Sequence, residues 1–374
     1  MGRRIEGRRF SWNLAILPVI LLLIVISLIN LRNADFYTGD TYHQRQIVWY
    51  LLFGIVGIIV AILDIRIFER LAWPAYIINI LLLGAVLVWG KEVNYSKRWI
   101  EIGGFTAQPS ELMKVTLILL VARILKQMHK PDFHRLRDLW KIALVVAPAA
   151  GLVLLEPDLG TTLLMLFVVA TMVIYEGIRM KSVALLVGTI LLVVPLAWQF
   201  DLIHDYQKNR VRLWMNPEQF KWDAESKRQI AKTLQPEQAL WSIGAGGFLG
   251  KGSQQGSRNR LKYLPEMQTD FILATFAEEH GFVGCMFLLV LYLFVFLWGA
   301  FVARHATDRF GVLVAIGLTS YLFWQTFINI GMVTTMLPVV GITLPFLSYG
   351  GSSLLSLMIG LGLLANIALH RGRT

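Results

Sequence analysis

Long apolar runs recur along the whole chain, and they constrain the fold more than any other feature. We identify about ten of them, each about 20 residues long, which is the length that a helix needs to cross a hydrocarbon core. Inside that core every backbone polar group must be bonded within the protein, so the runs have to be helices. Hydrophobic residues make up 56% of the chain and charged residues 16%, a balance that a water-soluble fold could not bury. The sequence therefore predicts an all-α polytopic membrane protein.

The predicted spans form a single membrane domain over residues 1–374. The arginine-rich start and the first apolar run resemble a signal peptide. That run is long, however, and no small-residue cleavage site follows it, so we expect a retained first span. The expected spans lie at 12–31, 47–64, 70–90, 110–126, 140–155, 160–177, 182–200, 281–303, 310–333 and 350–369.

Basic residues gather in alternate connections between the spans, and this predicts the orientation of the chain. The connection 126–141 is rich in Lys, Arg and His, and short basic loops of this kind stay in the cytoplasm. Both termini are therefore expected in the cytoplasm, and the long polar segment 201–269 is expected to be an extracytoplasmic loop between spans seven and eight. Its tryptophans, Trp214, Trp222 and Trp241, favour helices that lie along the membrane surface.

Net charge and cysteine content exclude two other features. The net charge is +11, but the same topological bias explains it, so no nucleic-acid partner is expected. The single cysteine, Cys285, lies in an apolar run, and one cysteine cannot form an intrachain disulfide.

Charged residues at the outer end of the fourth run mark a first candidate site. The segment QPSELMK (108–114) opens this span with a proline and a Ser-Glu pair, as is typical of a helix N-terminus. Glu111 and Lys114 lie three residues apart and so share a helix face. They are either a structural ion pair or a cation presented to an anionic lipid headgroup. The segment EPDLG (156–160) reads as a tight turn, whose two carboxylates could also hold a metal or orient Lys114.

The long loop and the helix after it carry further candidates. The glycine-rich strip GAGGFLGKG (244–252) contains Lys251, and backbone N–H groups in such a strip can surround phosphate oxygens, although the Walker spacing is absent. Asp270 follows at the start of a helix too long for one span, so we expect a break at Gly281 and an N-terminal cap from Thr269. Asp270 is either a favourable charge at a helix start or, beside an apolar wall, a carboxylate basic enough to act as a general base.

The connection 337–353 is irregular in pattern yet almost uncharged. Non-helical backbone at membrane depth is tolerated only where it is buried in protein or lines a cavity. We therefore expect this connection to fold back and to wall a groove on the outer side.

Five motifs, in this order, resemble the signature of the SEDS family (shape, elongation, division and sporulation). They are QPSE (108–111), PDLG (157–160), the Gly-Lys-Gly of the strip, LPE with TDF (264–271), and the run from NIGMV to SYGGS (329–352). The likeness covers nearly the whole chain. The short N-terminus and the MVxxxLPVVG form are more similar to the elongation members, RodA, than to the division members, FtsW. Glu156 and Arg258 depart from the family pattern, which tends to have Gln in both places.

The resemblance implies a peptidoglycan glycosyltransferase of the bacterial cytoplasmic (inner) membrane, which polymerises lipid II at the outer face for cell elongation and rod shape. It implies an inverting transfer from a lipid-linked pyrophosphate donor, in which a sugar hydroxyl of the acceptor displaces undecaprenyl pyrophosphate and a β-1,4 link forms. By its motif, Asp270 matches the essential aspartate of the family and is expected to be the catalytic base.

Cations are needed where charge develops on the leaving pyrophosphate. The expected substrate-binding residues are Lys114, Arg210, Lys251 and Arg98, with Glu111 orienting Lys114 or helping to hold a divalent cation such as Mg or Mn. The sequence does not specify a metal site.

The resemblance also implies partners. Beside lipid II and the growing glycan strand, these are a class B penicillin-binding protein with a single membrane anchor and other membrane proteins of the elongation complex. Span eight offers an apolar surface that could face the anchor, although exposure to lipid would explain the same composition. Its residues are Phe287, Leu291, Leu293, Phe294 and Phe296.

Three alternative functions stay open at this point. A lipid II flippase would need a hydrophilic path across the bilayer, whereas almost all ionisable residues here lie at the ends of spans. A scaffold that only binds partner enzymes would not need the Asp270 constellation. A division-specific polymerase of the FtsW type would share the chemistry but not the cellular role.

Overall fold

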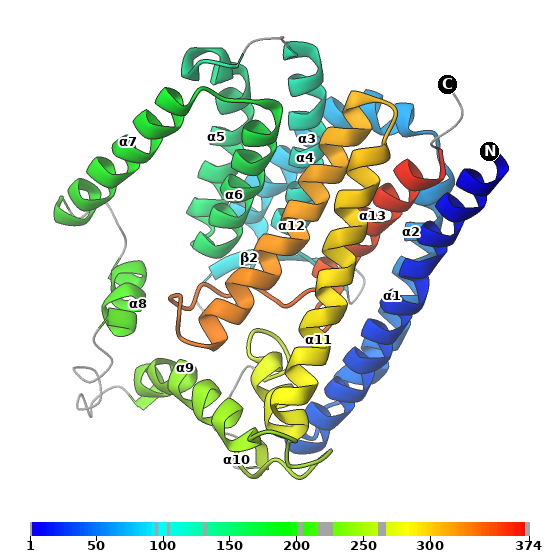
Figure 1. The fold of residues 1–374 in the computed structure, drawn as a ribbon. Coiled ribbons are helices and arrows are strands. Elements are labelled where there is room, and N and C mark those ends of the chain that lie inside the picture. The colour runs from blue at the N-terminus through cyan, green and yellow to red at the C-terminus, as the bar shows by residue number, and fades with distance from the viewer. Residues whose placement is uncertain are drawn as a thin grey trace.

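The computed structural model describes residues 2–93, 96–102, 105–129, 133–200, 205–215, 227–260 and 267–370. Within these residues, ten long helices correspond to the ten predicted spans (Figure 1). They are α1 (Gly2–Thr38), α2 (Tyr42–Ile62), α3 (Ile65–Trp89), α4 (Pro109–Met128), α5 (Trp140–Leu155), α6 (Leu159–Glu176), α7 (Met180–Gln199), α11 (Ile272–His305), α12 (Arg309–Val333) and α13 (Gly351–Leu369).

Eight helices of the described chain are long and apolar enough to cross a membrane, which confirms the polytopic all-α class. The predicted spans at α4 and α7 are not among these eight, so a total of ten stays a prediction. Helix α4 is surrounded by protein, because it packs against α3, α6, α12 and α13 and 14 of its residues are buried. Its charged side chains can therefore bind protein groups and need not face lipid. Both termini lie at one end of the bundle, and α9 and α10 lie at the other (Figure 1).

Shorter elements fill the connections between the long helices. A three-stranded antiparallel sheet, which the sequence analysis did not predict, links α3 to α4 through β1 (Lys91–Val93), β2 (Ser96–Ile102) and β3 (Phe105–Ala107). The 3-10 helix η1 (Leu136–Leu139) precedes α5. The long loop contains α8 (Asp205–Met215), α9 (Lys227–Gly246) and α10 (Ser257–Arg260), which confirms helices at Trp214 and Trp241, whereas Trp222 lies outside the described residues.

Small residues let α2 and α13 approach closely. A methyl group added to Gly362 would lie 2.4 Å from the carbonyl oxygen of Gly57, and one added to Gly57 would lie 2.9 Å from that of Met358. Close backbone approach of this kind replaces the hydrophobic effect as a source of helix association in lipid. Towards the C-terminal end of α13, the Asn366 amide donates to the carbonyls of Val60 and Ala61, so the contact is held by both packing and hydrogen bonds.

The connection between α12 and α13, residues 334–350, is non-helical, and its second half is largely buried, whereas Met336 is 75% exposed. The sequence analysis expected an irregular connection over 337–353, of which 351–353 belong to α13. Leu344, Phe346 and Leu347 are at most 2% exposed. A buried backbone without a helix leaves N–H and C=O groups that must find partners elsewhere. We call residues 334–350 the buried connection.

Side chains from four helices supply those partners. Ser27 of α1 and Tyr50 of α2 both donate to the carbonyl of Phe346, at 2.8 and 2.7 Å. Gln46 of α2 donates to the carbonyl of Ser348, and Tyr292 of α11 donates to that of Pro345. On α12, Gln325 donates to the carbonyl of Thr343 and Asn329 donates to that of Ile342. Each donor is a polar side chain on a long helix, and each donates to a carbonyl of the buried connection. These bonds fix its path against the bundle.

Helix α11 breaks at Gly281, at the place where the sequence analysis expected it. Gly281 has φ 64° and ψ −164°, which only glycine adopts readily. In a continuous helix the carbonyls of Glu278 and Glu279 would accept from amides four residues later. Here they accept from the amides of Lys251 and Gly252 instead, each at 3.0 Å. The glycine-rich strip thus replaces the missing donors.

The strip also replaces the missing acceptors. The amides of Phe282 and Val283, released by the break, donate to the carbonyls of Gly247 and Phe248 at 2.9 and 3.1 Å. A methyl group added to Gly250 would lie 2.2 Å from the Glu279 carbonyl oxygen, so glycine is required for this approach. We call this four-bond exchange between the strip and α11 the splice.

Candidate functional site

Asp270 lies in a turn directly before α11, and its backbone is held by α12 and the buried connection. The Asn329 amide donates to the Asp270 carbonyl at 3.0 Å, and the Ser348 hydroxyl donates to the Thr269 carbonyl at 2.7 Å. The expected cap is wrong: α11 begins at Ile272, its N-cap is Phe271, and no side chain caps it. Thr269 instead contributes its carbonyl to the anchoring of the Asp270 turn.

The carboxylate of Asp270 lies beside the buried connection at Gly341. A methyl group on Gly341 would lie 3.6 Å from Asp270 Oδ2, and Gly341 has φ 77°. The backbone at this position therefore adopts a conformation that glycine favours, and it brings the chain into contact with the carboxylate.

Arg210 reaches the same part of the buried connection from α8. Its Nη1 donates to the Val339 carbonyl at 2.7 Å, and Trp214, one helical turn later, donates to the Thr335 carbonyl at 2.9 Å. Two side chains of one short helix thus attach the described start of the long loop to the buried connection. Arg210 and Asp270 meet it two residues apart.

The turn between α5 and α6 meets the buried connection from a third direction. A methyl group on Gly160 would lie 2.5 Å from the Val340 carbonyl oxygen, so the start of α6 touches the connection through its backbone. Asp158 caps α6 by accepting from the Thr161 amide at 3.0 Å. The turn geometry expected for EPDLG is therefore present.

Arg98 of β2 holds that turn. Its guanidinium donates to the carbonyls of Glu156 and Pro157 at 2.7 and 2.5 Å and lies 3.7 Å from the Asp158 carboxylate. The predicted cation thus lies beside Asp158, and the sheet that the sequence analysis missed is the element that positions it.

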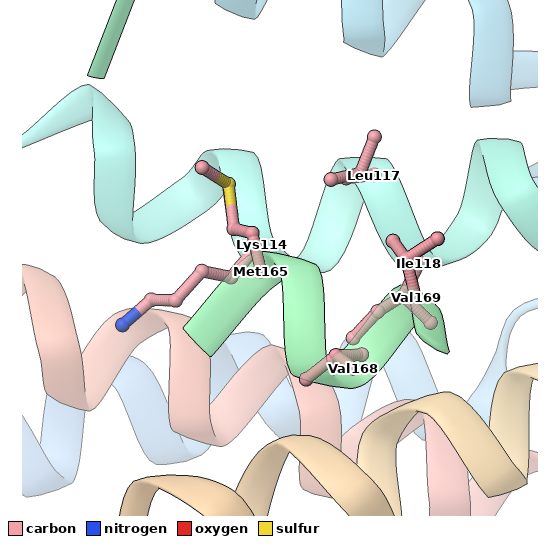
Figure 2. Close-up of a pocket in the computed structure, with 6 residues that line it drawn as sticks. All are labelled: Lys114, Leu117, Ile118, Met165, Val168 and Val169. Carbon is pink, nitrogen blue, oxygen red and sulfur yellow. The ribbon is translucent and has the colours of Figure 1, made fainter. Parts of the chain in front are cut away.

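Glu111 and Lys114 form the predicted ion pair on α4. Lys114 Nζ lies 2.8 Å from Glu111 Oε2, and both side chains are almost completely buried. The ammonium also lies 5.2 Å from the ring centroid of Tyr321 on α12, within the range of a cation–π contact. Its aliphatic stem lines a small apolar cavity between α4 and α6, and Figure 2 shows the ammonium pointing away from Leu117 and Ile118 at the other side of that cavity.

Lys251 belongs to a different cluster. Its ammonium lies 3.3 Å from Glu278 Oε1 and 2.5 Å from the Ser257 hydroxyl, and its backbone amide is part of the splice. The glycine-rich strip therefore bonds to α11 where the sequence suggested a phosphate cradle. This function of the strip was missed because it depends on a partner 27 residues away.

The site residues that sequence reasoning missed are the polar anchors Asn329 and Ser348. A signal for Asn329 was present, since a strongly polar residue inside an apolar span is costly unless it is bonded. Ser348 gives no such signal, because serine is common in loops. Neither position reveals its partner until the chain is folded.

Among the described residues, no group of three or more His, Cys, Asp or Glu side chains could hold a metal ion. The two carboxylates of the EPDLG turn do not fit a divalent cation either, because Asp158 caps α6 and pairs with Arg98. We derive no step through a metal.

Glu156 is an unusual group in this turn. It is 1% exposed, and neither of its carboxylate oxygens has a hydrogen-bond partner. Burial raises the pKa of Glu156 to about 8, the nearby charge of Asp158 adds to the rise, and Arg98 opposes it. At neutral pH this side chain is therefore mostly protonated.

The chain is similar to known proteins over almost its whole length. A family model that covers FtsW, RodA and SpoVE and is described as "Cell cycle protein" matches residues 8–373. The peptidoglycan glycosyltransferase MrdB of Escherichia coli K12 is 34% identical over 98% of this chain and 97% of its own. Stage V sporulation protein E of Bacillus subtilis is 35% identical over 96% of this chain and 98% of its own.

Two solved structures have the same fold. A chain of a peptidoglycan synthase complex, studied for the coordination of polymerization and crosslinking, has a TM-score of 0.78 and 29% identity, covering 96% of this chain and 98% of that one. The crystal structure of the rod shape determining protein RodA of Thermus thermophilus has a TM-score of 0.70 and 29% identity, covering 96% of this chain and 97% of that one.

The raised pKa of Glu156 predicts a pH-dependent gain in stability for Glu156→Gln. The Glu156 carboxyl loses its proton near pH 4.5 in the unfolded chain and near pH 8 in the folded one. The free energy of unfolding of the wild type therefore decreases as the pH rises from 4.5 to 8, and it stays at the lower value above pH 8. A rise from 4.5 to about 8 corresponds to a loss on the order of 5 kcal/mol. Thermal unfolding in detergent at pH 5 and pH 9 should show the variant clearly more stable at pH 9 and similar to wild type at pH 5.

A matched variant is Asp158→Asn, two residues away, which weakens a cap and an ion pair and should destabilise at both pH values. An equal gain for Glu156→Gln at pH 5 and pH 9, or no gain at pH 9, would show that Glu156 is not held protonated by burial.

Proposed function

The chain belongs to the FtsW, RodA and SpoVE family of peptidoglycan glycosyltransferases, in its RodA-like elongation branch, and on that premise we propose that it polymerises lipid II by an inverting transfer at the outer end of the bundle. It is a multi-pass protein of the bacterial cytoplasmic membrane. The observation that carries the proposal is the meeting of Asp270, Arg210 and the α5–α6 turn on one segment of the buried connection, 339–342.

Asp270 is the base in this proposal. A sugar hydroxyl of the acceptor attacks the anomeric carbon of the donor, and its proton passes to the Asp270 carboxylate. The new bond joins the hydroxyl oxygen to that carbon, while the bond between the carbon and the pyrophosphate oxygen breaks and its electron pair leaves with undecaprenyl pyrophosphate. Attack from the face opposite the leaving group inverts the configuration and gives the β-1,4 link. A positioned general base of this kind accelerates such a step by a factor of about 10² to 10⁴.

The surrounding cations stabilise the leaving pyrophosphate. Arg210 is the first candidate, because it lies on the same segment as Asp270 and its bond to the Val339 carbonyl can be exchanged for a phosphate oxygen. Arg98 lies beside the α5–α6 turn and binds the carboxylate of Asp158. Lys114 lies on α4 and binds the carboxylate of Glu111. Lys251 is the least direct of the four, since it serves the splice.

A crosslinking partner follows from the chemistry, because glycan strands must be joined after they are made. The related synthase complex couples polymerization with crosslinking. For this chain we propose a crosslinking partner of the class B penicillin-binding type, whose membrane anchor packs on α11. Phe287, Leu293 and Phe294 are about half exposed and available for such a contact. Phe296 is partly buried against Tyr292 and Phe323, whereas Leu291 is buried, so the expectation for Leu291 is wrong.

The flippase alternative is less well supported. At the cytoplasmic end, Lys126 of α4 lies 3.0 Å from Glu69 and 3.2 Å from Asp308, which joins three helices. Arg309 of α12 lies 2.8 Å from the buried Glu176 of α6. A lipid headgroup passing this end would have to break both ion-pair clusters.

We expect Asp270→Asn to lower polymerisation of lipid II by about 100-fold or more, because the amide keeps the shape but cannot take a proton. The measurement is glycan strand formation by purified protein, together with the partner if it is required. The matched control is Asp64→Asn, which also replaces an aspartate at a helix start, where asparagine caps equally well. Near-normal synthesis by Asp270→Asn would exclude the role as base.

The pair of Glu111 and Lys114 can be tested by comparing single and double variants. If Lys114 binds pyrophosphate, Lys114→Met loses activity whether or not Glu111→Leu is added. If the pair is structural, the double variant recovers, because replacing a buried ion pair by apolar residues is often neutral or stabilising. Lys126→Met on the same helix is the control, since it removes a paired lysine from the cytoplasmic end and should leave activity intact.

A further inference from the structure

The short helix that follows Asp270 is mounted separately from the rest of α11. Residues 272–280 lie on one side of the break at Gly281, and the membrane-spanning part lies on the other. A continuous helix would pass its orientation from one part to the next, but a residue at φ 64° and ψ −164° does not. Contacts with other elements must therefore set the direction of this short helix, and with it the place of Asp270.

The near end of the short helix is fixed through its backbone. Asn329 and Ser348 bind the carbonyls of the Asp270 turn, Tyr349 donates its amide to the Gln268 carbonyl at 2.9 Å, and the Asn30 amide donates to the Ile272 carbonyl at 3.3 Å. These bonds locate the near end, and the residues of the short helix from Ile272 to Glu279 are all buried.

The far end is held to the loop by the splice, and the side chain of Glu279 ties it to α1 as well. The Glu279 carboxylate accepts from Asn33 Nδ2 at 2.5 Å, from the Tyr37 hydroxyl at 2.8 Å and from the Gln254 amide at 3.0 Å. Asn33 and Tyr37 belong to α1, so one carboxylate joins the short helix, the first span and the long loop. Glu279 is 2% exposed, and the Tyr37 hydroxyl also accepts from the Gly256 amide at 3.0 Å.

The adjacent Glu278 binds the loop alone. It accepts from the amides of Arg258 and Asn259 at 2.9 and 3.1 Å and pairs with Lys251. Among the described residues, the hydrogen bonds and the ion pair of Glu278 go to the loop, whereas Glu279 links the far end of the short helix to α1. This difference selects Glu279 as the group that determines the angle of the short helix relative to the bundle.

We propose that Glu279, through Asn33 and Tyr37 of α1, is a positioning residue for Asp270. The inference rests on the proposed function, because it assigns Glu279 an effect only on the step in which Asp270 takes the proton. A reacting group that is displaced by about 1 Å can lose about 100-fold in rate, so a hinged helix held at both ends is a means of keeping the carboxylate in place.

The test uses Glu279→Gln in the full-length protein. Glutamine has nearly the same shape, but its NH₂ group must face one of three donors, so one anchoring bond is lost. We expect kcat for lipid II polymerisation to fall about tenfold, with KM within about twofold of wild type, because misplacement of a base affects the chemical step. Tyr37→Phe removes one hydroxyl without changing packing and should lower kcat by a smaller factor.

The matched control is Glu176→Gln. Glu176 is a buried glutamate that pairs with Arg309 at the cytoplasmic end, so its loss costs a comparable buried bond away from Asp270. Its kcat should equal that of wild type. A second comparison repeats Glu279→Gln in the Asp270→Asn background. If Glu279 acts through Asp270, the substitution causes no further loss of the residual rate. If Glu279 is needed only for the fold, it causes the same loss in both backgrounds.

Full kcat in Glu279→Gln and Tyr37→Phe, equal losses in both backgrounds, or an equal loss in Glu176→Gln would overturn the proposal. If Glu279→Gln does not fold, Tyr37→Phe decides the matter by the same readouts. Failure of the proposed function itself looks different: the wild type would make no glycan strands, or Asp270→Asn would be fully active.

Discussion

The fold depends on one constraint: the buried connection places non-helical backbone where water cannot satisfy it. Six polar side chains on four helices meet this demand, and each binds a carbonyl of the connection. Because these donors lie on α1, α2, α11 and α12, satisfying the connection also fixes how those helices pack. The connection in turn supplies the surface on which Asp270, Arg210 and the α5–α6 turn converge. The same bonds that make the backbone tolerable in the membrane thus assemble the candidate site.

The splice is a second solution to the same problem. A break in α11 frees two carbonyls and two amides, and the glycine-rich strip binds all four. The break allows the short helix after Asp270 to take its own direction, while the strip and the carboxylates of Glu278 and Glu279 hold that direction. At the splice the outer loop couples to the site through backbone geometry, whereas Arg210 of the same loop is the candidate cation for the leaving group in the proposed function.

Much of this could be predicted from the sequence, and the failures have physical reasons. Hydrophobic runs indicate the spans, and eight of the ten were confirmed by length and apolar character. The φ freedom at Gly281 and the i, i+3 spacing of Glu111 and Lys114 are local properties, so these two predictions were confirmed. The cap by Thr269 was wrong because its carbonyl is bound by Ser348, a residue 79 positions later. The splice at Lys251 was missed for the same reason, because its partner is 27 residues away. The sheet that carries Arg98 pairs residues at most eight positions apart, so it was missed although its pairing is local. Local chemistry is readable, whereas partner choice is a property of the fold.

The central claim is that the chain works from one side: a polymerase site at the outer end, and a cytoplasmic end closed by the ion pairs of Lys126 and Arg309. Sealed proteoliposomes with the outer end of the protein facing the medium test it most directly, with lipid II confined to one leaflet. The account predicts that lipid II in the external leaflet is converted into glycan strands, while lipid II in the internal leaflet stays unpolymerised and in place. Appearance of internal lipid II at an external probe, dependent on this protein, would contradict it.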